Sequence, residues 1–167
     1  MDSVCPHCSK PDMPVSTVFE KLPPYLVIHI ERSESTTING ECIIFKNSTK
    51  VIYPIHDLDM KPFVSEDLKQ TGEEFMYDLL AVVVHTGSNR EGHYSAICRD
   101  NVSREDKWFQ YNDLKVEEIT EGDIQNELAS ILVYSRKGQN LPTAKDLIPM
   151  INEWIAQRSS TSTPQKL

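Results

Sequence analysis

The expected fold is decided by residues 75–87, which read FMYDLLAVVVHTG. The run from Leu79 to Val84 is continuously apolar and rich in β-branched side chains, yet it is too short for a typical helix. A polar segment that contains glycine, residues 86–89, follows it directly. Because such segments end regular structure, the pattern predicts a central strand that runs into a loop.

Further strand-like segments lie on both sides of this run. We expect strands at residues 25–32, 41–46, 50–53, 93–99, 107–112 and 131–134, and a short helix at residues 121–128. Segments 41–46 and 50–53 flank a polar turn, and segments 93–99 and 107–112 have the spacing of a β-hairpin. These elements predict an α+β fold that is mostly antiparallel β-sheet.

The chain changes character after residue 137. Six apolar residues recur there at helical spacing: Ala144, Leu147, Ile148, Ile151, Trp154 and Ile155. They predict an amphipathic helix whose apolar stripe docks onto its own domain. Residues 159–164 are polar and are expected to be disordered. We therefore expect one domain at residues 1–137, followed by a helix and a polar tail at residues 138–167.

The composition excludes some partners and compartments. With 25 acidic and 17 basic residues the formal net charge is −8, which argues against binding to nucleic acid. The N-terminus lacks the pattern of a signal peptide, and no apolar run approaches the length of a membrane span. We expect a location in the cytoplasm, the nucleus or both. There, the four cysteines are thiols or metal ligands rather than disulfides.

The residues with the clearest chemical potential are His93 and Asn112. If the hairpin of segments 93–99 and 107–112 closes on Asp100 and Glu105, His93 lies directly opposite Asn112 on one face. The amide oxygen of Asn112 then accepts the Nδ1–H of the imidazole, which leaves Nε2 free as a base. This is the base and orienting partner of a thiol hydrolase.

The spacing alone leaves a plainer alternative open, in which His93 is a surface histidine beside an asparagine turn. Gly92 favours the first reading, because a residue without a side chain lets an extended peptide approach the histidine closely.

Three segments resemble the histidine box of the ubiquitin-specific proteases: residues 81–87, Gly92-His93-Tyr94, and residues 108–113. Residues 22–32, 53–60 and 129–136 are similar to further landmarks of that family, and all occur in the family's order. The resemblance implies the palm and part of the fingers of a papain-like cysteine protease fold, with the helical thumb missing.

The same resemblance implies a function and residue roles. The family removes ubiquitin from protein conjugates with a cysteine nucleophile, so ubiquitin and ubiquitinated proteins are the expected partners. His93 would be the general base and then the acid, Asn112 its orienting partner, and Asp113 a neighbouring polar support. Gly92 and Tyr94 would line the channel for the Gly-Gly tail of ubiquitin. No cofactor is expected for catalysis.

One departure from the family pattern is large, because the cysteine box that carries the nucleophile has no counterpart here. Cys98 is five residues from His93 along a strand and so points to the other face. Cys42 lies in a predicted strand with nothing nearby to lower its pKa. The chain is therefore expected to be an inactive fragment of a thiol-dependent ubiquitinyl hydrolase whose N-terminal half is missing. The alternative is a non-catalytic ubiquitin-binding or scaffolding module.

Cys5 and Cys8 form a CxxC pair, which in this family joins an earlier pair to hold a structural zinc. Tetrahedral zinc needs four ligands. We expect Cys5 and Cys8 to be a half-site that binds zinc only if a second CxxC pair is supplied.

Overall fold

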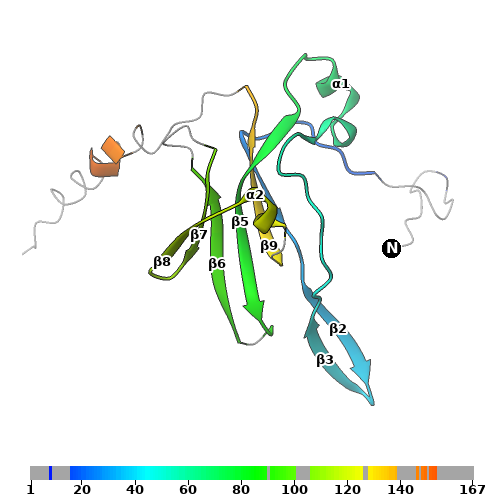
Figure 1. Ribbon diagram of the computed structural model, residues 1–167. Coiled ribbons are helices and arrows are strands. Elements are labelled where there is room, and N and C mark those ends of the chain that lie inside the picture. Colours follow the sequence, from blue (N-terminus) through cyan, green and yellow to red (C-terminus); the bar gives the residue numbers. More distant parts are fainter. Residues whose placement is uncertain are drawn as a thin grey trace, which may run out of the picture.

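The structure is a computed structural model that describes residues 8, 16–89, 91–100, 106–125, 128–138, 146, 148, 149 and 151–153. Within these ranges no helix is long and apolar enough to cross a membrane. The long apolar strand predicted at residues 75–85 is the centre of the molecule, and it extends two residues further, to Gly87 (Figure 1).

Seven strands form one antiparallel sheet in the order β1-β9-β5-β6-β7-β8, and β4 pairs with the start of β5. Their bounds are β1 (Tyr25–His29), β4 (Leu58–Asp59), β5 (Met76–Gly87), β6 (Gly92–Arg99), β7 (Trp108–Asn112), β8 (Lys115–Ile119) and β9 (Ala129–Arg136). The expected fold class, mostly antiparallel sheet with few short helices, is confirmed at this level. β8 was not among the predicted strands.

The two faces of β5 are buried to different extents. Leu79, Val82 and Val84 are almost fully buried, with 0 to 2% of their surface exposed. Residues 81 and 83 on the opposite face are only half-buried. A register shift at residue 80 lets the strand keep one set of side chains in the core along its whole length. The apolar run therefore packs one face fully and leaves the other partly open.

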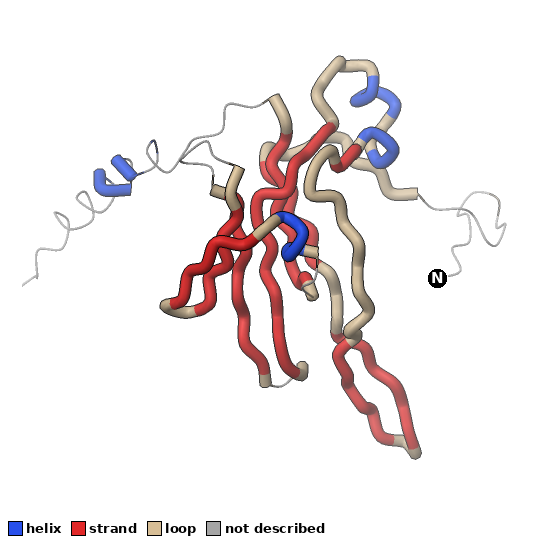
Figure 2. The backbone as a smooth tube through the Cα atoms, viewed as in Figure 1, coloured by secondary structure: helices blue, strands red, loops and turns tan. Residues whose placement is uncertain are grey.

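Short helices and the loops between them pack against the buried face and one end of the sheet (Figure 2). They are η1 (Lys61–Phe63), α1 (Glu66–Lys69) and α2 (Glu121–Ile124). The side chain of Ser65 caps α1 by accepting the backbone N–H of Leu68, and Thr120 and Asp123 form a capping box on α2. These caps direct Leu68 and Ile124 into the core.

A separate hairpin of β2 (Ser33–Ile38) and β3 (Glu41–Lys46) projects away from the sheet (Figure 1). Its turn is Asn39-Gly40, and both residues have positive φ, at 53° and 85°. Two consecutive positive φ angles match the right-handed twist of a hairpin, and Asn-Gly is the sequence that adopts them most readily. The prediction that residues 41–46 form a strand is confirmed, but its partner is β2.

The prediction of a strand at residues 50–53 is wrong. Tyr53 is buried and its hydroxyl donates to the carbonyl of Ile124 at 3.1 Å, whereas Ile52 is 84% exposed. This segment is an irregular connection that fastens α2 to the sheet, so it has no strand partner.

In the tail, residues 146, 148, 149 and 151–153 are helical, as predicted. Ile148 and Ile151 of the apolar stripe are 55% and 52% exposed, so these two side chains are not docked on the domain as expected. Ala144, Leu147, Trp154, Ile155 and residues 159–164 lie outside the described residues.

Candidate active site

The structure brings His93 and Asn112 together. His93 is the second residue of β6 and Asn112 is the last residue of β7. The imidazole Nε2 lies 2.6 Å from the amide oxygen Oδ1 of Asn112, which is a short hydrogen bond. Because an amide oxygen can only accept, Nε2 donates this hydrogen bond, and in the neutral ring Nδ1 then has the free lone pair.

Two details of the predicted pair are wrong. Ala96 pairs with Tyr111 in the structure, so Asn112 would oppose Ser95, and the register differs by two residues from the expected one. A shift of two keeps both side chains on the same face, and a histidine is long enough to reach a diagonal neighbour. The nitrogen that meets Asn112 is Nε2 and not Nδ1, so the free base is the other nitrogen.

Asp113 lies next to this pair, but it is farther from the imidazole than Asn112 is. Its φ of 52° is part of the turn between β7 and β8. Its carboxylate Oδ2 is 3.8 Å from Nε2 of His93, and the two side chains are 79% and 48% exposed. At this distance and exposure the carboxylate would act on a protonated His93 ring through a screened charge rather than through a hydrogen bond.

Gly92 is required by the packing of the chain itself. A Cβ atom at this position would lie 2.0 Å from Nε2 of His85 and 2.6 Å from the carbonyl oxygen of Thr86. The ring of His85 fills that space and stacks on Tyr94, with 4.5 Å between the ring centroids. Tyr94 is 63% exposed, and by strand alternation it lies on the face opposite to His93.

Two residues near His93 were not identified from the sequence. One is His85, which packs between Gly92 and Tyr94, and the other is Lys46. The Nζ of Lys46 donates to the carbonyl oxygens of His85 and Gly87, at 2.6 and 3.1 Å. The Asn39-Gly40 turn could have placed Lys46 at the base of a hairpin, but it carries no signal for the contact with β5.

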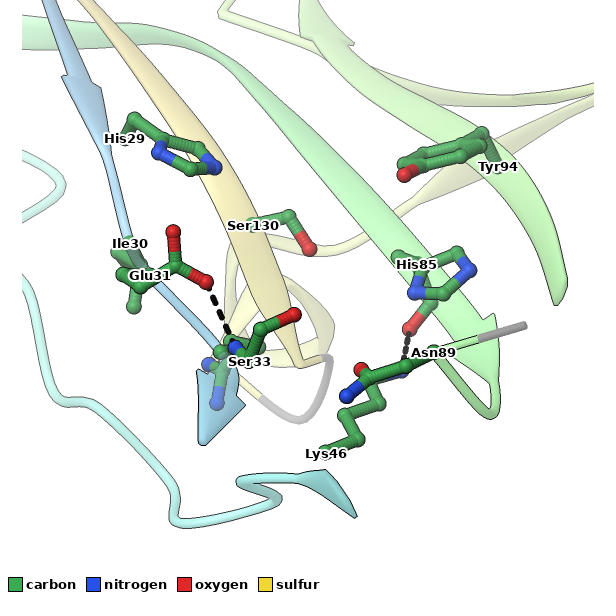
Figure 3. A pocket seen from close by; sticks show the side chains of 10 residues that line it. His29, Ile30, Glu31, Ser33, Lys46, His85, Asn89, Tyr94 and Ser130 are labelled. Carbon is green, nitrogen blue, oxygen red and sulfur yellow. Dashed lines mark hydrogen bonds between the residues drawn. The ribbon is translucent and has the colours of Figure 1, made fainter. Parts of the chain in front are cut away.

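Figure 3 shows a polar cavity of about 130 Å³ on the Tyr94 side of the sheet. His29 and Glu31 border it from one side, and His85 and Tyr94 from the other. A second cavity of about 260 Å³ is lined by Lys46, Ser48, Val84, His85, Thr86, Gly87 and Leu128. Lys46 and His85 line both cavities, so both lie near the end of β5 that carries Thr86, the cross-strand partner of His93.

None of the described cysteines is placed as a nucleophile for His93. Cys98 pairs with Ala81 and Phe109 on the opposite face, and burial raises the pKa of its thiol. Cys42 is exposed beside the hairpin turn, opposite Thr37. Cys8 is exposed, and Cys5 lies outside the described residues. Among the described residues no group of three or more potential ligands could hold a metal ion.

Comparison with known proteins assigns the chain to a family. A family model described as ubiquitin carboxyl-terminal hydrolase matches residues 2–134. The match spans most of the chain, so the protein belongs to the ubiquitin carboxyl-terminal hydrolase family. The resemblance to the ubiquitin-specific proteases is thereby confirmed.

Solved structures of the SAGA DUB module are similar in fold and sequence. One structure of Ubp8/Sgf11/Sus1/Sgf73 matches with 29% identity and a TM-score of 0.59, over 74% of this chain and 26% of that chain. A structure of the yeast module with a mutant Sgf73 matches with 30% identity and a TM-score of 0.60, over 74% and 27%. A structure of the module bound to monoubiquitin matches with 27% identity and a TM-score of 0.61, over 84% and 29%. The chain thus spans less than a third of the length of these relatives.

Proposed function

We propose that this chain is the histidine-bearing part of a cysteine-type deubiquitinase domain that removes ubiquitin from protein conjugates. The observation that carries the proposal is the 2.6 Å contact between Nε2 of His93 and Oδ1 of Asn112 in a chain of this family. The chain corresponds to the palm and part of the fingers, and the helical thumb with the nucleophilic cysteine comes from another segment. Ubiquitin is the partner, as in the related module bound to monoubiquitin.

The proposed chemistry follows from the free nitrogen. The thiol of the nucleophile gives its proton to Nδ1 of His93, and the thiolate attacks the carbonyl carbon of the isopeptide bond. The imidazolium returns the proton to the leaving amine, and a water molecule then hydrolyses the thioester by the same route. Asn112 keeps the proton on Nε2 throughout, and the carboxylate of Asp113 stabilises the imidazolium weakly. Gly92 and Tyr94 are proposed to border the channel for the ubiquitin tail.

The test is the His93→Ala variant of the complete enzyme that contains this segment. We expect turnover of a ubiquitin C-terminal reporter to fall by about a thousandfold or more, while the Kd for ubiquitin changes little, because proton transfer is felt in the transition state. His56→Ala is the matched control, since His56 is also partly exposed and lies 3.1 Å from the carboxylate of Glu121. Near-normal turnover of His93→Ala would refute the proposal.

The effects on turnover of removing Asn112 and Asp113 should follow their distances from the ring of His93. Asn112→Ala should reduce turnover by about ten- to a hundredfold, because the imidazole remains but loses its orientation. Asp113→Ala should cost less than Asn112→Ala, because its carboxylate is 3.8 Å away and exposed. A reversed order would assign the orienting role to Asp113.

A second candidate is a non-catalytic module that binds ubiquitin. It is favoured by the placement of the described thiols, because Cys98 is on the wrong face and Cys42 is at the hairpin turn. The mass of the native protein distinguishes the candidates. A species well above 19.1 kDa that contains a reactive cysteine supports the enzyme, and a species of 19.1 kDa that binds ubiquitin without hydrolysis supports the module.

The remaining expectations accompany the enzyme. We propose that catalysis needs no cofactor, and that Cys5 and Cys8 bind a structural zinc only with a second CxxC pair. A location in the cytoplasm or the nucleus is proposed, because a thiol nucleophile stays reduced in those compartments.

A further inference from the structure

Strand β5 continues past the end of its neighbour β9. The pairing of β5 with β9 stops at Val84, which lies opposite Ala129, whereas its pairing with β6 continues to Gly87. Beyond Val84, β9 therefore offers no hydrogen-bond partners to the carbonyl groups of His85 and Gly87. A backbone carbonyl that is shielded from water costs free energy when it has no partner, and His85 is half-buried, so a donor is expected at its carbonyl.

Lys46 is that donor. Its Nζ lies 2.6 Å from the carbonyl oxygen of His85 and 3.1 Å from that of Gly87. Figure 3 shows the lysine beside the strand, with the bond to the His85 carbonyl drawn as a dashed line. Hydrogen bonds from an ammonium group are stronger than those between neutral groups. The lysine therefore takes the place that β9 leaves at this edge.

The two carbonyls flank the residue that pairs with the histidine. In the register of β5 and β6, Thr86 lies opposite His93, and Gly87 lies opposite Gly92. Lys46 thus donates hydrogen bonds to the backbone on both sides of Thr86. The pairing of β6 with β7 begins only at Ala96, and Asn112 is held by its pairing with Lys115 of β8. A displacement of the end of β5 would therefore move His93 relative to Asn112.

We propose that Lys46 is a positioning residue, which fixes the end of β5 so that His93 keeps its contact with Asn112. The inference rests on the proposed function for its effect on turnover, and on the hydrogen bonds of Lys46 for its structural part. Lys46 reaches the histidine through the backbone of β5, and it contacts neither the imidazole nor Asn112 in the bonds described above.

Lys46 links the end of β5 to the projecting β2–β3 hairpin. Lys46 is the last residue of β3, and it pairs with Ser33 at the base of the hairpin. The adjacent Arg32 is buried, and its guanidinium donates to the carbonyls of Ala129, Asn47 and Thr49. The base of the hairpin is therefore fixed to the sheet at two points. Through Lys46, the position of the hairpin is coupled to the position of the histidine.

The experiment compares Lys46→Met, Lys46→Arg and Lys50→Met in the protein at its full natural length. Methionine keeps the length of the stem and removes the charge, and arginine keeps a cationic donor. Lys50 is exposed four residues further along, so Lys50→Met is the matched control. Two readouts are needed: kcat and KM on ubiquitin with a C-terminal reporter, and amide hydrogen exchange by mass spectrometry in peptides that cover residues 85–94.

For Lys46→Met we expect kcat to fall by about ten- to a hundredfold with KM nearly unchanged, because a small misplacement of a catalytic group has effects of this size. Amide exchange at residues 85–94 should increase. Lys46→Arg should recover most of both losses, and Lys50→Met should resemble the wild type.

The two readouts separate the inference from the proposed function. Wild-type exchange at residues 85–94 in Lys46→Met would overturn the inference, whatever the turnover. An increase in KM with an unchanged kcat would also overturn it. So would a fall in kcat that is equal in Lys46→Arg and Lys46→Met. If the wild type shows no turnover that depends on His93, the proposed function fails, and the exchange data still decide whether Lys46 holds the strand end.

Discussion

The central sheet and the β2–β3 hairpin use their apolar side chains differently. In the sheet, Leu79 and Val82 have none of their surface exposed. In the hairpin, Ile44 is 62% and Ile38 51% exposed, although both are strand residues of the same kind. Burial stabilises the folded state in proportion to the area removed from water, so the sheet supplies most of the stability. The exposed apolar residues of the hairpin contribute little to stability by burial.

The hairpin is still an ordered element, because the pairing of β2 with β3 and the hydrogen bonds at its base hold it in place. The Asn39-Gly40 turn fixes its register, and Arg32 and Lys46 tie its base to the sheet. Exposed apolar side chains on a fixed support are typical of a surface that binds another protein. The contrast with the sheet therefore separates residues that maintain the fold from residues available for recognition.

The largest effect on this contrast is expected from Leu79→Ala. Removing a fully buried leucine side chain leaves a cavity, and the free energy of unfolding should fall by about 3 to 5 kcal/mol. Leu80→Ala is the matched control, because the adjacent residue is only half-buried at the bulge. Chemical denaturation of both variants gives the comparison. Equal losses would mean that the second face of β5 is as well packed as the first.

A smaller effect with a distinct pH dependence is expected from Tyr134→Phe. Tyr134 is 1% exposed, and its hydroxyl donates to the carbonyl of Pro54 at 2.8 Å. Phenylalanine leaves that carbonyl unpaired, which should cost about 1 to 2 kcal/mol at neutral pH.

Burial raises the pKa of the Tyr134 hydroxyl above its value of 10.0 in the unfolded chain. The unfolded state therefore releases its proton first, so the stabilisation from Tyr134 is complete below pH 10 and is lost as the pH rises above it. Unfolding measured from pH 9 to 11 should show a smaller alkaline loss in Tyr134→Phe. Some loss remains, because burial also raises the pKa of Tyr77. An identical alkaline loss in both proteins would contradict the burial of this hydroxyl.

Much of the sheet follows from local sequence, and its failures have physical causes. The apolar run of β5 predicted a central strand because its six consecutive residues, Leu79 to Val84, are all apolar and half of them are β-branched. The strand at residues 50–53 was wrong because Tyr53 is buried through contacts with α2, which lies about seventy residues away along the chain. The Asn39-Gly40 turn was present in the sequence, and its hairpin was overlooked in favour of the polar segment that follows.

The candidate site was predictable in part for a different reason. His93 and Asn112 meet despite an error of two residues in register, because strand alternation preserves the face over an even shift. The choice between Nδ1 and Nε2 depends on the ring rotamer, which spacing does not determine. The contact of Lys46 with β5 spans 39 residues and depends on where β9 ends, so no local pattern contains it.

A local effect is expected from Gly40→Ala in the hairpin turn. At a φ of 85° an added Cβ meets no atom within 4 Å, so the cost comes only from the backbone conformation. It should be about 1 kcal/mol, confined to the hairpin. Amide exchange should increase in β2 and β3 and stay unchanged in β5 and β9. Increased exchange in the sheet as well would show that the two regions unfold together.

The smallest effect on stability is expected from Ile44→Ser. Because Ile44 is 62% exposed, the free energy of unfolding should change by less than about 0.5 kcal/mol. If the hairpin is a recognition surface, the same variant should weaken ubiquitin binding by about five- to thirtyfold, the loss of 1 to 2 kcal/mol typical of an apolar contact at an interface. Ser35→Ala is the matched control, since Ser35 is the cross-strand partner of Ile44 on the same face. Unchanged stability with unchanged ubiquitin affinity would remove Ile44 from the recognition surface. A large loss of stability would instead show that Ile44 is covered by another part of the native protein, and that the contrast between hairpin and sheet belongs only to the isolated chain.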